Sequence, residues 1–201
     1  MSDRAIAVVS AGLSEPSSTR MLADLLAAAA TRALKQRGID SAVEVVELRD
    51  HARDLPNRMI AGVGSPALDQ AIDAVVSADG LIVVTPVFSA SYSGLFKIFF
   101  DILEPEALKG KPVLIAATAG TPRHSLVLDH ALRPLFSYLG AVVVPTGVFA
   151  ANEDWGAGSD QALSKRAERA GAELAELVAA DRPHLGRFDD VPSFETLLAG
   201  D

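Results

Sequence analysis

Strand-like and helix-like segments alternate five times along this chain, and this alternation is the strongest constraint on its fold. Most of the strand-like runs are continuously aliphatic, as expected of strands buried on both faces, whereas the second alternates and should be more exposed. The pattern predicts an α/β fold with a doubly wound, five-stranded parallel sheet, right-handed crossovers and helices on both faces. The expected strands are Ala5–Val9, Ala42–Leu48, Gly80–Val84, Lys111–Ala117 and Ala141–Val144, the last with an alternative end at Ala150.

Capping and turn residues set the expected helix ends. Ser65 is suited to an N-cap and Pro66 to the first helical position, while Gly38 closes the first helix. Pro134 should kink or restart its helix, because proline has no N–H to donate. The expected helices are Arg20–Gly38, Pro66–Ala78, Gly94–Leu103, Ser125–Gly140 and Asp160–Ala180.

The segment Arg49–Pro66 is interpreted as a long irregular loop that borders the site or a subunit contact. Within it, Gly62–Ala67 matches a loose dinucleotide-binding glycine pattern. We reject that match because no strand-like run precedes Gly62.

Length and composition limit the classes of protein that fit. The 201 residues can bury a core without a disulfide or metal, so we expect one domain over 1–180 and a polar tail over 181–201. The absence of Cys excludes disulfides and thiolate catalysis. A net charge of −8 with scattered acidic residues argues against non-specific nucleic-acid binding, and it means that any phosphate site must rely on local donors. No signal-peptide core or apolar stretch of ~20 residues is present, so we expect a soluble, cytoplasmic protein.

The loop after the first strand is rich in hydroxyl groups and leads directly into a helix. Unpaired amides and the positive end of the helix dipole make such a place suitable for a phosphate. The alternative is an ordinary Ser or Thr N-cap with nothing bound. Five hydroxyl residues within ten positions favour the phosphate: Ser10, Ser14, Ser17, Ser18 and Thr19.

Two further loops follow the third and fourth strands, where open α/β sheets bind ligands. Thr85–Leu103 contains a short Ser-rich turn before the helix at Gly94, and it is where we expect the chemistry. Ala117–Ser125 is a loop of small residues. The three loops should meet at one edge of the sheet.

Three blocks of the chain resemble the NADPH-dependent FMN reductase family, whose fold is flavodoxin-like. Ser10–Leu26 is similar to its phosphate loop, TPVFSASYSGLFKIFFD at Thr85–Asp101 to its T-P-V-Y-x-A-x-Y-S-G signature, and Ala107–Leu135 to its fourth-strand block. The resemblance is closest to the alkanesulfonate-type branch, which supplies reduced FMN to two-component monooxygenases. It implies an enzyme that transfers hydride from NAD(P)H to FMN and assembles as a homodimer or homotetramer.

The resemblance also implies which residues bind FMN. One group would hold the phosphate, a second would line the ring system and a third would close the other edge of the ring. These groups are Ser10, Ser17, Ser18 and Thr19; Pro86, Val87, Phe88, Ser89, Ser91, Tyr92, Ser93 and Gly94; and Thr118, Ala119, Gly120 and Thr121.

Some positions are unusual within this resemblance. In this branch a Tyr at the position of Tyr92 is associated with a π-type turn at a subunit interface, so Tyr92 is expected to control how firmly flavin is held; the alternative is a packed Tyr at a helix start. Phe88 stands where the family commonly has Tyr. Ala119 replaces the first of two glycines, so the backbone there is less free to adopt positive φ.

Hydride transfer needs no general base, since the chain has only to stack the two rings, so we nominate no catalytic residue. We expect no metal site, because His124 and His130 are six residues apart and would not share one face of a helix. His124 could touch nicotinamide or phosphate, or act as a cap or surface residue, while His130 is expected to pack on its helix. A hydrolase is disfavoured because Ser91 breaks the G-x-S-x-G pattern.

Other functions and contacts stay open on the sequence alone. The enzymatic alternative is a quinone, azo or chromate-type reductase with tightly bound FMN, and the non-enzyme alternative is a flavodoxin-like electron carrier. Trp155 could cover the flavin, although an anchor or interface role is preferred. The apolar stripe Leu95, Ile98, Phe99 and Ile102 suits either core or subunit interface.

Overall fold

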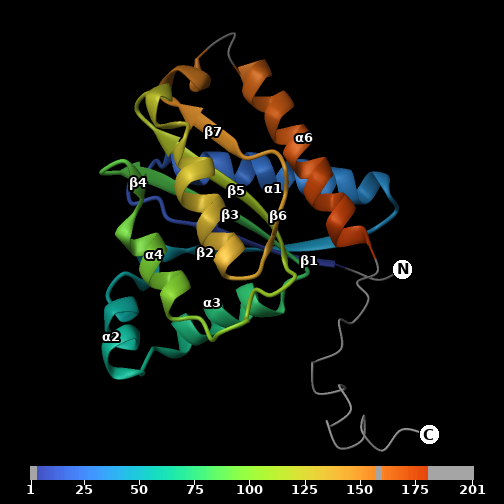
Figure 1. The fold of residues 1–201 in the computed structure, drawn as a ribbon. Coiled ribbons are helices and arrows are strands. Elements are labelled where there is room, and N and C mark those ends of the chain that lie inside the picture. Colours follow the sequence, from blue (N-terminus) through green and yellow to red (C-terminus); the bar gives the residue numbers. More distant parts are fainter. Residues whose placement is uncertain (1–3, 157–159, 181–201) are drawn as a thin grey trace, which may run out of the picture.

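A twisted sheet forms the centre of the computed structural model, which describes residues 4–156 and 160–180 (Figure 1). The predicted tail, 181–201, lies outside the described residues. The strand order is β2-β1-β3-β5-β6, with β7 also paired to β5 and β4 antiparallel to β3. All other pairings are parallel, so the predicted doubly wound fold is confirmed. The strands are β1 Arg4–Ser10, β2 Ser41–Glu47, β3 Gly80–Phe88, β4 Ser91–Tyr92, β5 Pro112–Ala119, β6 Val142–Val143 and β7 Val148–Ala151.

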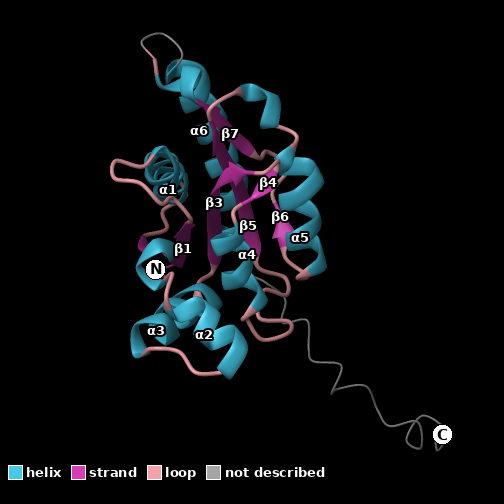
Figure 2. Cartoon of the chain, turned by 90° about the vertical axis from the view of Figure 1, so that its left-hand side faces the viewer, coloured by secondary structure: helices cyan, strands magenta, loops and turns pink. Residues whose placement is uncertain are grey.

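Helices cover both faces of the sheet, and Figure 2 shows the strands between the two groups. Alternate residues of each central strand enter opposite cores: Ile82 packs toward α1 and α6, whereas Val83 packs toward α3, α4 and α5. This two-sided burial explains the continuous aliphatic runs in the sequence. The helices are α1 Ser18–Gln36, α2 Asp54–Ala61, α3 Pro66–Ser77, α4 Gly94–Asp101, α5 Arg133–Tyr138 and α6 Asp160–Ala179.

The segment predicted to be irregular is helical, so that prediction was wrong. It contains a 3-10 turn, Leu48–His51, and helix α2, which ends at Gly62 with φ 70°. Leu55 is fully buried, but Ile60 is 86 % exposed, so α2 has too narrow an apolar stripe to show a clear helical period. The predicted cap of α3 is confirmed, because the Leu68 N–H donates to Ser65 Oγ at 3.2 Å.

The fifth strand is split in two, contrary to the single strand expected. Pro145 cannot donate to a neighbouring strand. The N–H and hydroxyl of Thr146 each donate at 2.7 Å to the Glu173 carboxylate on α6. In the gap between β6 and β7, hydrogen bonds to α6 therefore replace the strand pairing with β5.

The helix predicted over 125–140 starts later than expected and is divided into a π-helical turn and a short α-helix. A 3-10 turn at Pro122–His124 (η2) precedes a π-helical turn at Leu128–Leu132 (η3), and α5 begins at Arg133. Arg133 N–H bonds the carbonyl of Leu128, five residues back. Pro134 would otherwise clash with the carbonyl of His130, so the wider turn accommodates the predicted interruption.

None of the helices within 4–156 and 160–180 combines the length and apolar character needed to cross a membrane.

Candidate functional site

A cleft of about 390 Å³ opens at the carboxyl ends of the central strands. The three loops singled out above meet there, and Asn152 joins them from a fourth segment just after β7. The lining residues are Leu13, Ser14, Ser17, Ser18, Thr19, Pro86, Val87, Phe88, Thr118, Ala119, Gly120 and Asn152.

The start of α1 forms one wall of the cleft. Ser17 is the N-cap, and its Oγ accepts a hydrogen bond from Arg20 N–H at 3.2 Å. Ser18 and Thr19 occupy the first turn, where backbone N–H groups have no acceptor within the helix. These amides, with the positive end of the helix dipole, suit a phosphate.

A pair of buried hydroxyl groups joins this wall to the end of β5. Thr19 Oγ1 and Thr118 Oγ1 lie 2.8 Å apart. Nearby, at the end of β1, Ser10 is fully buried, and its Oγ has no hydrogen-bond partner within the part of the chain that the structure describes. Ser10 does not line the cleft itself.

The wall formed by β3 differs from the short turn that was expected. The strand continues through Phe88 and reverses into β4, and Ser93 N–H donates to Thr85 Oγ1 at 3.0 Å across this hairpin. Phe88 is 48 % exposed at the cleft. An apolar, half-exposed ring of this kind offers a planar surface against which a flat ligand could stack.

Two residues at the tip of the hairpin have left-handed backbone conformations. Ser89 has φ 49° and Ala90 has φ 67°, as in a two-residue type I′ turn, where Asn and Gly are preferred. Neither residue is glycine, so this turn stores strain beside the cleft.

Replacing Ala90 by Gly should therefore raise the free energy of unfolding by about 0.5–1 kcal/mol, because glycine adopts positive φ without steric cost. Urea unfolding would measure it. Ala28→Gly provides a matched control, since Ala28 is an exposed residue inside α1 and should lose about 1 kcal/mol. A decrease for both variants would contradict the strained turn.

The third wall is the end of β5. Ala119 is still part of the strand, and neither it nor Gly120 has positive φ, so the loss of a glycine at 119 imposes no backbone strain. Asn152, just after β7, faces Gly120: a Cβ built on Gly120 would lie 3.8 Å from Asn152 Nδ2. Sequence reasoning missed Leu13, Ser14 and Asn152 as lining residues, although Ser14 was among the hydroxyl groups noted.

The remaining predicted residues lie outside the cleft lining, and their role in binding stays a prediction. Ser89 is exposed at the hairpin tip and Gly94 is exposed at the first position of α4. Ser93 is buried and caps α4 by accepting from Phe96 N–H at 3.2 Å. Thr121 accepts a long hydrogen bond of 3.5 Å from Arg123 N–H.

Tyr92 does not form a π-type turn, so that expectation was wrong. It belongs to β4, and α4 begins after it as an ordinary α-helix. The described π turn is η3, forced by Pro134, and it packs against β4. The expectation rested on the family resemblance at Tyr92, whereas the π turn of this chain follows from Pro134.

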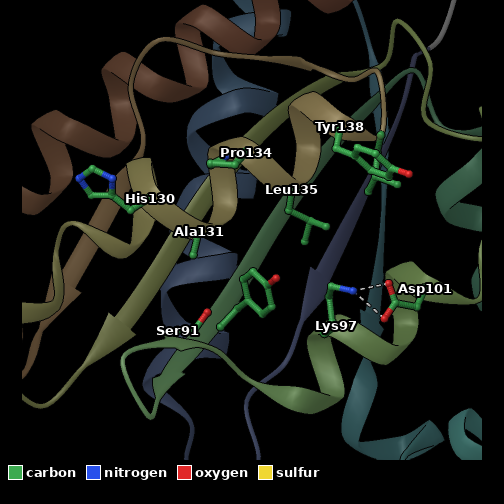
Figure 3. Close-up of a pocket in the computed structure, with 10 residues that line it drawn as sticks. Ser91, Lys97, Asp101, His130, Ala131, Pro134, Leu135 and Tyr138 are labelled. Atoms are coloured by element: carbon green, nitrogen blue, oxygen red, sulfur yellow. Dashed lines mark hydrogen bonds and ion pairs between the residues drawn. The ribbon is translucent and has the colours of Figure 1, made fainter.

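A second cavity of about 440 Å³ lies between β4, α4, η3 and α5 (Figure 3). Tyr92 and Ser91 line it, with His130 and the Lys97–Asp101 ion pair. His130 is therefore exposed in the π turn rather than packed on a helix. Tyr138 projects from this region and is 89 % exposed.

Trp155 takes the anchoring role preferred from the sequence. It is partly buried and packs against the core formed with α1 and α6. It does not line the cleft.

Comparison with known proteins decides the family. Residues 5–156 match the family model described as NADPH-dependent FMN reductase. The chain belongs to this family. The family and enzyme class expected from the three sequence blocks are confirmed, and the three clustered walls agree with an FMN site.

Individual relatives agree with this assignment. The FMN reductase (NADPH) of Pseudomonas aeruginosa is 43 % identical over 150 residues, covering 75 % of this chain and 78 % of the relative. A solved oxidoreductase from Corynebacterium diphtheriae is 53 % identical with a TM-score of 0.86, covering 89 % of this chain and 98 % of that chain. The apo form of the NADH:FMN oxidoreductase EmoB is 32 % identical with a TM-score of 0.72, covering 90 % and 92 %.

Proposed function

We propose that this FMN reductase family member binds FMN in the cleft as an exchangeable substrate, reduces it with NAD(P)H and releases FMNH2 to a partner flavin-dependent monooxygenase. The observation that carries the site is the convergence of Ser17–Thr19, Pro86–Phe88 and Thr118–Gly120 on one cleft. It places anion donors and a flat apolar surface together. The alkanesulfonate-type branch and the cytoplasmic location expected from the sequence are part of this proposal.

The chain's own residues would bind and orient rather than transfer protons. The first-turn amides of Ser18 and Thr19 would hold the FMN phosphate, with the buried Thr19–Thr118 contact fixing the distance between two walls. Phe88 and Gly120 would flank the ring, since one supplies a planar surface and the other has no side chain to obstruct approach. FMN, when bound, accepts the hydride itself. The walls need only hold the two rings about 3 to 3.5 Å apart.

A homodimer or homotetramer is also proposed. The apolar stripe on α4 is largely core in the single chain: Phe99 is fully buried, while Leu95, Ile98 and Ile102 are partly buried. The exposed Tyr138 beside the second cavity is therefore a better candidate for subunit contact.

Steady-state NADPH oxidation with and without added FMN, and with a menaquinone analogue, tests the proposal. We expect turnover to depend on free FMN. FMN should bind with micromolar affinity and should therefore be lost on dialysis. Full-rate quinone reduction without added flavin, by protein that retains FMN through dialysis, would instead support the reductase with bound FMN. Retained flavin without either activity would support an electron carrier.

A further inference from the structure

Arg123 occupies a turn that comes shortly after the end of β5, one wall of the cleft. It lies in η2, which directly follows β5, three residues after the lining residue Gly120. This turn packs against β7, which leads to Asn152 on the facing wall. Arg123 does not itself line the cleft, but both neighbours of its turn, the end of β5 and β7, lead to residues that do.

The other guanidinium groups next to the cleft-lining segments are neutralised by carboxylates. For Arg20, the hydrogen bonds that its guanidinium donates to the Asp24 and Glu47 carboxylates raise its pKa above the ordinary arginine value. The pairs are Arg20 with Asp24 at 2.8 Å and Glu47 at 2.6 Å, Arg49 with Glu15 at 2.5 Å, and Arg166 with Asp154 at 2.7 Å.

Arg123 is exposed, and its side chain makes no ion pair or hydrogen bond with any residue in 4–156 or 160–180. Arg53 and Lys165 are the other Arg and Lys side chains in those ranges with no such partner. On a chain with a net charge of −8, an unpaired guanidinium just after a cleft-lining segment is a local source of attraction for an anion that the whole protein repels.

We propose that Arg123 binds a phosphate group of the incoming NAD(P)H and so determines its affinity. The proposal rests on NAD(P)H being the hydride donor. A guanidinium suits phosphate because its planar fork can donate two parallel hydrogen bonds. The FMN phosphate is a less suitable partner, because it has its own donors at the start of α1. At the end of β5, Thr118 hydrogen-bonds Thr19 in the first turn of α1, whereas Arg123 lies five residues beyond Thr118 in the chain.

Arg123→Ala tests the proposal, with Arg53→Ala as a control that removes the same charge. Arg53 is exposed at the start of α2, a helix packed on the opposite core from α1, and it does not line the cleft. Titration calorimetry would measure binding of NADP⁺ and NAD⁺, and steady-state assays the KM for NADPH, NADH and FMN. We expect nucleotide binding to weaken about 10- to 50-fold in Arg123→Ala, the usual effect of losing a charged hydrogen-bonding partner, while the KM for FMN stays within about twofold.

The two nucleotides identify which phosphate is bound. Loss confined to NADP⁺ and NADPH would support the proposal through the 2′-phosphate, and equal loss for both nucleotides would support it through the pyrophosphate. Arg123→Lys should keep part of the affinity, since the charge remains without the fork. Unchanged nucleotide binding, an equal loss in Arg53→Ala, or a rise in the KM for FMN alone would overturn it. Wild-type protein that oxidises neither nucleotide in the presence of FMN would count against the proposed function instead.

Discussion

Replacing Gly171 by Ala should lower the free energy of unfolding by about 2 kcal/mol, even though alanine is the better helix former by about 1 kcal/mol. Gly171 lies within α6 where this helix crosses α1 (Figure 1). A Cβ there would lie 2.7 Å from the backbone nitrogen of Ala30 and 2.8 Å from the carbonyl carbon of Ala29. Backbone atoms cannot rotate away, so the two helices must separate and loosen the core between them.

Urea unfolding and the thermal midpoint would measure this effect, and a loss of about 2 kcal/mol corresponds to a fall of roughly 4–8 °C for a domain of this size. Gly94→Ala is the matched control, because a Cβ on Gly94 would meet nothing within 4 Å at the exposed start of α4. It should change stability by less than about 0.5 kcal/mol. Equal stability of Gly171→Ala and the wild type would show that α1 and α6 do not approach this closely.

Gly171 also shows why part of this fold could not be predicted from the sequence. Within a helical pattern a glycine indicates only a small local cost. The reason for it is a contact with α1, more than a hundred residues earlier in the chain. Gly12 presents the same problem in a loop, since the atoms that exclude a side chain there become visible only after folding.

Features that depend on local pattern or on general sheet rules were predicted correctly. Buried aliphatic runs identified the central strands, and Ser65 with Pro66 identified the start of α3. The convergence of three loops followed because carboxyl ends of parallel strands share one edge. The cleft joins Ser17, Phe88 and Gly120 for this reason.

The errors arose where a weak local signal was overridden by context. Ser89 and Ala90 form a type I′ turn without the Asn-Gly sequence that is typical of one. The β3–β4 hairpin was therefore predicted only as a short turn. Asn152 lines the cleft just after β7, the second part of the divided fifth strand, and no pattern near residue 152 indicates this. The π turn was assigned to Tyr92, although the proline that causes it is Pro134.

The second large effect is expected at Gly12, where alanine should weaken FMN binding about 10- to 100-fold if the cleft holds FMN as proposed. A Cβ at this position would lie 2.1 Å from Ser17 Oγ and 3.1 Å from Thr19 Cβ. The Ser17 hydroxyl must then leave its capping position, which removes the N-cap of α1 and loosens the first turn, whose amides are proposed to hold the phosphate. Loss of the cap alone should cost about 1 kcal/mol of stability, measurable without flavin.

A second substitution separates this clash from other effects. Ser17→Gly removes the obstructing hydroxymethyl group, and glycine is itself a tolerated N-cap that costs only a few tenths of a kcal/mol. Flavin fluorescence quenching on titration should therefore show that Gly12→Ala/Ser17→Gly binds FMN more tightly than Gly12→Ala and about as well as Ser17→Gly alone. Such non-additivity is expected of residues that touch or share a network, and not of distant, independent sites. If the double variant binds no better than Gly12→Ala, the close approach of residues 12 and 17 does not shape the phosphate site, and the donors for FMN must be sought on another wall of the cleft.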